Sequence, residues 1–493
     1  MEDKGSPAQD ERLTLASTTG APFRFTAGIA RLSATDSPAR SFEITGPGPT
    51  AGSVKTREYR LPDSGHNSYL DLFRNLARDF GTRLPRNRRP ASRPAFSAKY
   101  RALLTENLAP GILYGYGDPA VLRVAGEGGG ADGAWYYIVV TSNDAPDSFP
   151  IIRSRDLASW EFVGFVFPQG RKPGWAADGK HVSDFWAPEM HFVGGEFRAY
   201  FVARDSDTCQ LSIGVAKSAS PEGPFSAGPE PLLTGNSIDP HVFVENAGSA
   251  YLYWKEDNND IWPSRLTHLL HEHPHLIARL FPEREDQITA SFIQTLWPWI
   301  RGLQPIERFL AQQVLIEAVT SAFSAFQDRL NRLLDSHDAP GADEAARDVL
   351  RAMRTPVYAQ RLSADGLSLV GERTKVIEND QAWEAHLIEG MWLVERGRKY
   401  YLFYAGNDFS TTEYGIGVAI ADSPLGPYRK MAEPLLGSTE EWSGPGHPSV
   451  AAGPDGEPLL FFHAFFPGRT GYKEFRALLA TRIEFKADRV LLK

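Results

Sequence analysis

Two distant segments of the chain repeat each other, and this repeat constrains the fold more than any other feature. The segments IGVAKSASPEGPFSAGPEPLL (213–233) and IGVAIADSPLGPYRKMAEPLL (416–436) align without a gap. Each follows two short apolar runs joined by a turn, WAPEMHFVGGEFRAYFVA (186–203) and IEGMWLVERGRKYYLFYA (388–405). Apolar and aromatic runs interrupted by glycine are typical of antiparallel hairpins. The chain therefore repeats a unit of several strands.

Three further segments begin in the same way, which brings the number of units to five. They are DPAVLRV (118–124), IDPHVFVENAGSAYLYW (238–254) and GHPSVAAGPDGEPLLFFHAF (446–465). With a helical insertion set aside, the starts recur every roughly 50 to 70 residues, about the size of a four-stranded propeller blade. This spacing predicts an all-β five-bladed β-propeller with an inserted α-helical subdomain and an N-terminal extension. A β-sandwich is the alternative, but it does not require full-length repeats.

The composition changes along the chain and indicates where the propeller begins and ends. Residues 1–110 are rich in Pro, Arg, Ser and Thr. We expect a partly irregular extension there, with one amphipathic helix over 68–80. The strand pattern predicts the first part of the propeller over 111–262 and the second part over 355–493.

Residues 263–354 have a different pattern, which predicts a helical insert. LIEAVTSAFSAFQDRLNRLL (315–334) has apolar residues at helical spacing and contains neither Gly nor Pro. DQITASFIQTLWPWI (286–300) follows the same spacing as far as Pro298. A small helical bundle is expected between two strands of the third unit.

The bulk composition argues against some classes of partner. A formal net charge of -9 gives no reason to expect nucleic-acid binding. No stretch approaches the roughly 18 apolar residues of a membrane span. A single cysteine, Cys209, excludes an internal disulfide framework. Because the N-terminal segment lacks an apolar signal region, we expect a cytoplasmic location, with secretion as the alternative.

Three acidic residues, Asp118, Asp239 and Glu389, stand at the starts of first strands. We predict that they occupy corresponding positions in their units and converge on the propeller axis. Carboxylates brought together repel one another, and their pKa values move apart. One can then stay protonated as an acid while another stays ionised as a base, as glycoside hydrolysis requires. Each residue taken singly is alternatively a turn aspartate or a solvated strand-end glutamate.

The sequence resembles glycoside hydrolase family 43 in five ordered motifs. These are YGDPAVLRV, FWAPEMHFVGGEFRAYF, SIDPHVFVE, LIEGMWLVERGRKYYLFYAG and SGPGHPSV. The resemblance implies that Asp118 is the general base, that Glu389 is the general acid, and that Asp239 raises the pKa of the acid and holds it in place. It also implies inversion at the anomeric carbon, with base and acid roughly 6.5–9.5 Å apart.

The resemblance implies further contacts around the pocket. His447 matches an axial histidine that contacts substrate and binds a calcium ion directly or through water; its alternative is a packed turn histidine. No cofactor is required, and a structural calcium is the one ion implied. Phe185 and Trp186 resemble aromatic residues of the pocket wall, with the propeller core as the alternative. Arg476 resembles a basic residue of the last blade that contacts substrate hydroxyls.

The chain departs from the family pattern at two places. Met391 stands where a small residue or proline usually follows Glu-Gly, which would reshape the pocket. The helical insert interrupts the third unit, where it could cover the pocket, bind a partner or mediate oligomerisation. The insert begins with HLLHEHPHL (268–276), whose four histidines match no standard zinc spacing. A polar entry to a helix is the preferred interpretation.

These observations predict an inverting glycosidase with a carbohydrate substrate. We expect it to remove terminal α-L-arabinofuranosyl or β-D-xylosyl units. The arabinofuranosyl unit comes first because WEAHLIEGMW (383–392) and QRLSADGLSLVGE (360–372) resemble that branch of the family. The alternative is a catalytically silent carbohydrate-binding propeller or an interaction scaffold, which would not need all three carboxylates.

Overall fold

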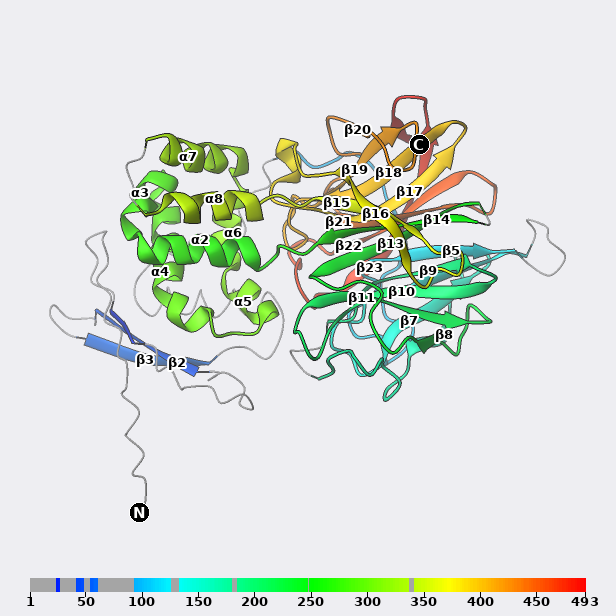
Figure 1. Cartoon of the computed structure of the whole chain (residues 1–493), viewed down its shortest axis with the longest axis horizontal. Helices are drawn as coiled ribbons and strands as arrows, with labels where there is room; N and C mark the ends of the chain where they lie inside the picture. Colours follow the sequence, from blue (N-terminus) through cyan, green and yellow to red (C-terminus); the bar gives the residue numbers. More distant parts are fainter. Residues whose placement is uncertain are drawn as a thin grey trace, which may run out of the picture. The chain divides into compact units, whose positions relative to one another are not determined.

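The computed structural model describes residues 24–26, 41–47, 54–60, 93–125, 133–179, 184–246, 248–336 and 341–493 (Figure 1). Contacts divide the chain into two compact units. One unit is Pro90–Asn258 with Met353–Lys493, and the other is Met1–Arg89 with Asn259–Ala352. In the described part of the chain, no helix has the length and apolar character of a membrane span. The helix expected over 68–80 lies outside the described residues.

The larger unit contains five antiparallel sheets, each built mainly from strands that follow one another along the chain. The first sheet is β5 (Ala120–Val124), β6 (Trp135–Val139), β7 (Ser148–Ser154) and β8 (Glu161–Phe167). The second is β9 (Trp186–Val193), β10 (Glu196–Arg204), β11 (Leu211–Ser218) and β12 (Ser226–Ala227). The third is β13 (Ser237–Asn246), β14 (Ser249–Glu256), β15 (Val357–Leu362) and β16 (Leu369–Ile377). The fourth is β17 (Ile388–Arg396), β18 (Lys399–Gly406), β19 (Gly415–Ala421) and β20 (Arg429–Lys430). The fifth is β21 (Ser443–Ala452), β22 (Pro458–Phe465), β23 (Arg476–Phe485) and β24 (Val490–Leu492).

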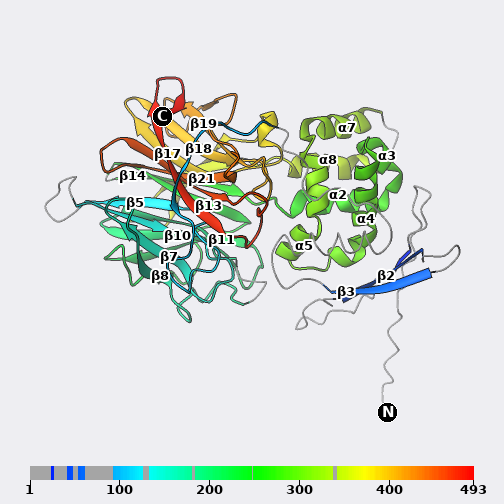
Figure 2. The same cartoon turned by 180° about the vertical axis from the view of Figure 1, so that it is seen from behind.

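The first strands of the five sheets form a closed ring. β5 contacts β9, β9 contacts β13, β13 contacts β17, β17 contacts β21, and β21 contacts β5 (Figure 1 and Figure 2). Two stacked sheets could not produce this cyclic order, so the sandwich alternative is wrong. The arrangement is that of a β-propeller, whose first strands surround a common axis.

Inner strands such as β18 are apolar along most of their length because each sheet packs against a neighbour on both faces. In β18, Tyr401 and Phe403 belong to one hydrophobic cluster, while Tyr400, Leu402 and Tyr404 belong to another. Successive side chains of a strand point to opposite faces, so this alternation places one set in each inter-sheet core. A continuous apolar run in a propeller is therefore a strand buried on both faces.

The repeated segments fold in the same way in the second and fourth sheets. Segment 213–233 supplies most of β11 and all of β12, and segment 416–436 does the same for β19 and β20. Both contain a cis Gly-Pro bond, and both close with the same backbone bridge, Ile213 with Leu233 and Ile416 with Leu436. The sequence repeat is thus a structural repeat.

The region before the propeller differs from the expected irregular extension. Three strands, β1 (Arg24–Thr26), β2 (Ser41–Pro47) and β3 (Val54–Arg60), form a small antiparallel sheet. β4 (Arg101–Leu104) pairs with β23 and enlarges the fifth sheet. The hydroxyl of Tyr100 donates to the carbonyl oxygen of Gly437 at 2.7 Å. The propeller unit therefore begins near Pro90 rather than at 111, because this connecting stretch packs into the core.

The smaller unit is helical between Ile261 and Ala352. It contains α2 (Ile261–Glu272), η1 (Pro274–Leu276), α3 (Ile277–Leu280), α4 (Arg284–Ile300), α5 (Pro305–Ala311), α6 (Gln313–Thr320), α7 (Phe323–Ser336) and α8 (Asp343–Ala352). The two strands that flank it, β14 and β15, pair directly, with Lys255 opposite Val357. The insert therefore leaves the ladder of the third sheet intact.

The structure adds two details to the helical prediction. The run 315–334 forms parts of two helices, because α6 ends at Thr320 and α7 starts at Phe323. α6 and α7 contact each other, so the chain bends at this break and buries both segments. Pro298 lies inside the last turn of α4 rather than ending the helix before it.

Candidate active site

The first strands share an irregularity near the end at which the chain enters them. Asp118, Ala187, Asp239, Gly390 and His447 all have positive φ angles, between 42° and 59°. The pairing of the first strand with its neighbour shifts register at this point in four sheets. Such bulges redirect side chains and are frequent beside functional sites. The positive φ angles therefore mark one level of the propeller in five sheets, and a bulge accompanies them in four.

This register corrects one prediction about the three acids. Asp118 and Asp239 occupy the same positive-φ position, but the residue that corresponds to them in β17 is Gly390. Glu389 pairs with Ala405, as Ile238 pairs with Lys255, so Glu389 lies one residue earlier. The prediction of a shared position is wrong for Glu389. Each bulge adds one residue to its strand, and the sequence repeat does not reveal at which residue the bulge falls.

Asp118 is held by groups from the fifth sheet and from its own. Its Oδ1 accepts a hydrogen bond from Nη1 of Arg476 at 2.8 Å, and its Oδ2 accepts one from the Thr141 hydroxyl at 2.5 Å. Nδ1 of His447 lies 3.4 Å from Oδ1, and Nδ1 of His463 lies 3.5 Å from it. Burial alone would raise the pKa of Asp118, but the charge of Arg476 and these neighbours outweighs it and holds the pKa below its ordinary value. Asp118 is therefore ionised at neutral pH.

Glu389 has the opposite environment. Its Oε1 accepts a hydrogen bond from the Tyr414 hydroxyl at 2.7 Å, and its Oε2 lies 3.4 Å from Nζ of Lys255. Burial raises the pKa of Glu389 above its ordinary value; Lys255 opposes that rise and Asp239 adds to it. A carboxyl of this kind keeps its proton at a pH where Asp118 has lost its own.

Asp239 connects the third sheet to the strand that carries Glu389. Its Oδ2 accepts a hydrogen bond from the backbone N–H of Gly390 at 2.9 Å. Burial raises the pKa of Asp239 to about 7, although the charge of Lys255 opposes the rise. A side chain at Gly390 would meet the His447 ring at 2.9 Å, so glycine permits this close approach. Asp239 thus lies beside Glu389 and holds its backbone.

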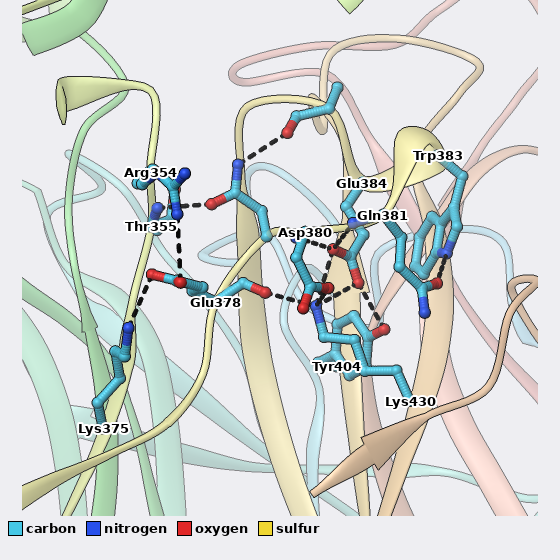
Figure 3. Close-up of polar contacts among 12 residues, drawn as sticks. Arg354, Thr355, Lys375, Glu378, Asp380, Gln381, Trp383, Glu384, Tyr404 and Lys430 are labelled. Atoms are coloured by element: carbon cyan, nitrogen blue, oxygen red, sulfur yellow. Dashed lines mark hydrogen bonds and ion pairs between the residues drawn. The ribbon is translucent and has the colours of Figure 1, made fainter. Parts of the chain in front are cut away.

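A second network fixes the segment that leads into β17. Glu384 is fully buried and accepts hydrogen bonds from Nζ of Lys430 at 2.7 Å and from the Tyr404 hydroxyl at 2.7 Å. Its other oxygen accepts the backbone N–H groups of Asp380 and Gln381. Figure 3 shows Tyr404, from β18, and Lys430, from β20, pointing at Glu384. These contacts anchor the loop only a few residues before Glu389.

The aromatic residues expected at the pocket wall divide into two cases. Phe185 is fully buried, belongs to the main core cluster and packs against Phe149 with ring centroids 5.7 Å apart. Its pocket-wall prediction is wrong, because the residue packs between sheets. Trp186 is partly exposed, and its Nε1 has no hydrogen-bond partner among the described residues. Its substrate contact stays a prediction.

Comparison with known proteins identifies the family. The model of glycosyl hydrolases family 43 matches residues 114–286 and 346–491. The chain belongs to glycosyl hydrolases family 43. The gap in the match falls within the helical insert of the third sheet.

Similar proteins are found among curated sequences and solved structures. The chain is 28% identical over 261 residues to "Xylosidase/arabinosidase 43A" of Humicola insolens, covering 52% of this chain and 61% of that protein. It is 22% identical over 306 residues to "Xylosidase/arabinosidase" of Bacteroides ovatus, covering 62% and 71%. The crystal structure of a thermostable family-43 glycoside hydrolase has 25% identity and a TM-score of 0.51, covering 77% of this chain and 93% of that one. The match thus spans less than two thirds of the Humicola relative.

Three groups around the family 43 carboxylates escaped the sequence analysis: Lys255, Tyr414 and His463. Lys255 pairs with Ile238, and His463 pairs with Gly446. They therefore occupy equivalent positions in the second strands of the third and fifth sheets. The register of the hairpins could have indicated both. Nothing in the local sequence indicates Tyr414, which lies just before β19.

Nδ1 of His447 lies 3.4 Å from Oδ1 of Asp118, and His447 belongs to no group of three His, Cys, Asp or Glu ligands among the described residues. A calcium ion held by His447 directly or through water stays a prediction. The only such group among the described residues is Glu189, His191 and His241. There Glu189 accepts from both histidines, at 2.6 and 2.9 Å, and Nε2 of His241 accepts the N–H of Leu393. Nδ1 of His241 then carries a proton, and the three side chains form a buried hydrogen-bond network.

The histidines of 268–276 form no group of three potential metal ligands in the described structure. The His268 ring lies tilted against Trp297, His271 hydrogen-bonds through Nδ1 to the carbonyl oxygen of Gln294, and His273 lies edge-on to His275. The segment covers the end of α2 and η1, so it is a polar helix end rather than the expected helix entry.

Proposed function

We propose that this family 43 chain is an inverting glycoside hydrolase with a five-bladed propeller, its five sheets being the blades. The substrates proposed are oligosaccharides or polysaccharides that end in α-L-arabinofuranosyl or β-D-xylosyl units. Names of two curated relatives, both xylosidase/arabinosidase, support this substrate class. The observation that carries the proposal is the opposite environment of two buried carboxyls in one ring of strands.

In the proposed reaction Asp118 is the base. Arg476 and Thr141 hold both of its oxygens and favour the ionised form. A carboxylate in this state accepts a proton from water while the water attacks the anomeric carbon. The fixed orientation matters because the water must approach the face opposite the leaving group.

Glu389 is the acid in this scheme. It donates its proton to the glycosidic oxygen as the bond to the anomeric carbon breaks. The Tyr414 hydroxyl fixes Oε1, and Asp239 holds the next peptide N–H, so the carboxyl has little freedom to turn away. Trp186 is the residue proposed to pack against the sugar ring.

Parallel assays with aryl α-L-arabinofuranoside and aryl β-D-xylopyranoside test the proposal. Proton NMR of the first-formed sugar should show the anomer opposite to that of the substrate. Release from one or both substrates with inversion is the expected result. Absence of release from both, or retention of configuration, would contradict the proposed reaction.

A further inference from the structure

Lys255 is a buried cation beside the Glu389 carboxyl. Its side chain has no exposed surface, and its Nζ lies 3.4 Å from Oε2 of Glu389. Nζ makes no hydrogen bond with any residue that the structure describes. A buried ammonium is costly unless an opposite charge lies close to it. Lys255 therefore requires a carboxylate charge in this site.

Its backbone position explains why it points there. Lys255 pairs with Ile238, directly before the bulge at Asp239. The equivalent second-strand residue of the fifth sheet is His463, which lies beside Asp118. The two strands thus place Lys255 next to Glu389 and the imidazole of His463 next to Asp118, where burial lowers the pKa of His463 and keeps it neutral.

Several charged and titratable groups face the same carboxyls. Glu389 is influenced by Lys255 from β14, Asp239 from β13, Tyr414 ahead of β19 and His447 from β21. Asp239 is influenced also by Asp118 and Asp257. Lys255 in turn acts on His386, whose pKa burial lowers to about 3, so that this imidazole is neutral. Lys255 is therefore the cation that acts on both carboxyls of the Glu389–Asp239 pair.

We propose that Lys255 is a positioning residue that keeps one proton, and only one, on the Glu389–Asp239 pair. With both carboxyls ionised the buried trio carries one excess negative charge, and with both protonated it carries an unbalanced ammonium. With a single proton the trio is neutral, which is the cheapest state to bury. The ammonium balances the charge of whichever carboxyl of the pair is ionised, and the pair keeps one proton available for the leaving group. This inference rests on the proposed function.

Removal of the Lys255 cation should change the number of protons that the Glu389–Asp239 pair holds. Without the ammonium the neutral state of the pair has two protons, and each carboxyl loses its proton at higher pH. Because an opposite charge at this distance lowers a carboxyl pKa by roughly 1 to 3 units, the alkaline limb of kcat/KM in Lys255→Met should move upward by about that amount. Lys255→Arg keeps the charge and should leave the limb near its wild-type position.

The experiment compares wild type, Lys255→Met, Lys255→Gln and Lys255→Arg with Lys430→Met as control. Lys430 is also a buried lysine paired with a glutamate, but its partner Glu384 has no proposed part in the reaction. The first readout is the pH dependence of kcat/KM. The second is an infrared titration of protonated carboxyls, assigned by the bands lost in Glu389→Gln and Asp239→Asn.

The inference predicts that in Lys255→Met and Lys255→Gln the alkaline limb of kcat/KM and the infrared titration midpoint both move to higher pH. Neither should move in Lys255→Arg or Lys430→Met. If neither neutral variant shifts the infrared midpoint, or if Lys430→Met shifts it equally, the inference is overturned. If Lys255→Met does not fold, Lys255→Gln and Lys255→Arg still decide. An infrared shift in a protein that cleaves neither glycoside would overturn the proposed function but support the proton count.

Discussion

Nη1 of Arg476 donates to Oδ1 of Asp118 at 2.8 Å, although 358 positions separate the two residues. Closure of the ring brings them together, since β5 of the first sheet contacts β21 of the fifth and Arg476 begins β23. A side chain at Gly117 would overlap the Arg476 guanidinium at 1.8 Å, so the neighbouring glycine makes room for the pair. This contact sets the charge state of the proposed base.

Replacement of Arg476 by methionine should therefore raise the pKa of Asp118. The charge of Arg476 is the chief influence that lowers this pKa. Because the base works only when ionised, the acidic limb of kcat/KM should move upward, by roughly 1 to 3 pH units. Rate measurements between pH 3 and 8 on an activated aryl glycoside check this. Arg482→Met, at an exposed arginine of the same strand, is the control, and an unmoved acidic limb in Arg476→Met would contradict the prediction.

Replacement of Glu389 by glutamine should impair the departure of poor leaving groups selectively. The variant keeps the shape of the side chain but has no proton to give, so kcat should fall by roughly 10²–10⁴ on substrates with alkyl leaving groups. Aryl glycosides with acidic phenols need little protonation and should lose much less. The dependence of kcat on the leaving-group pKa measures this. An equal loss on all substrates would argue against Glu389 as the acid.

Replacement of Asp239 by asparagine should change how stability depends on pH. The pKa of Asp239 is raised in the folded protein to about 7 from 3.8. Between these two values the folded state holds a proton that the unfolded state has lost, so this group makes the free energy of unfolding fall as pH rises, by up to about 1.4 kcal/mol per pH unit. Asparagine does not titrate, so the variant lacks this decrease in the free energy of unfolding. The stability of the variant relative to wild type should therefore increase as the pH rises from 4 to 7.

Thermal unfolding of both proteins across this pH range measures the effect. Asp422→Asn, at an exposed aspartate of the fourth sheet, is the control and should follow wild type. A constant difference between Asp239→Asn and wild type at every pH would contradict the raised pKa.

Replacement of Lys430 by methionine should destabilise the fourth sheet. The variant leaves Glu384 fully buried without its cation, and breaking a buried ion pair in this way costs about 3–5 kcal/mol. The loss should be visible as a lower denaturant midpoint. The double variant Lys430→Met with Glu384→Gln should recover part of it, because no charge then stays unpaired. A double variant that is less stable than the single one would contradict this account.

Local sequence predicted much of the fold and part of the candidate site. The repeat of 213–233 in 416–436 reports a recurring strand unit because both copies must satisfy the same pairing and the same cores. The equivalence of Asp118 and Asp239 is visible in the sequence, since each precedes a proline at a strand start. In contrast, strands β1 to β3 were missed, since Pro- and Ser-rich sequence has little alternating pattern.

The sequence by itself determined the strand units, the helical insert and the presence of three acids near strand starts, because these depend on periodicity and turn chemistry within short segments. Only the tertiary structure decided that Glu389 lies one residue before the bulge, that Phe185 belongs to the core, and that Lys255 and Arg476 face different carboxyls. Those facts depend on strand register and ring closure, which join residues hundreds of positions apart. Charge state follows from such neighbours, and no local pattern contains them.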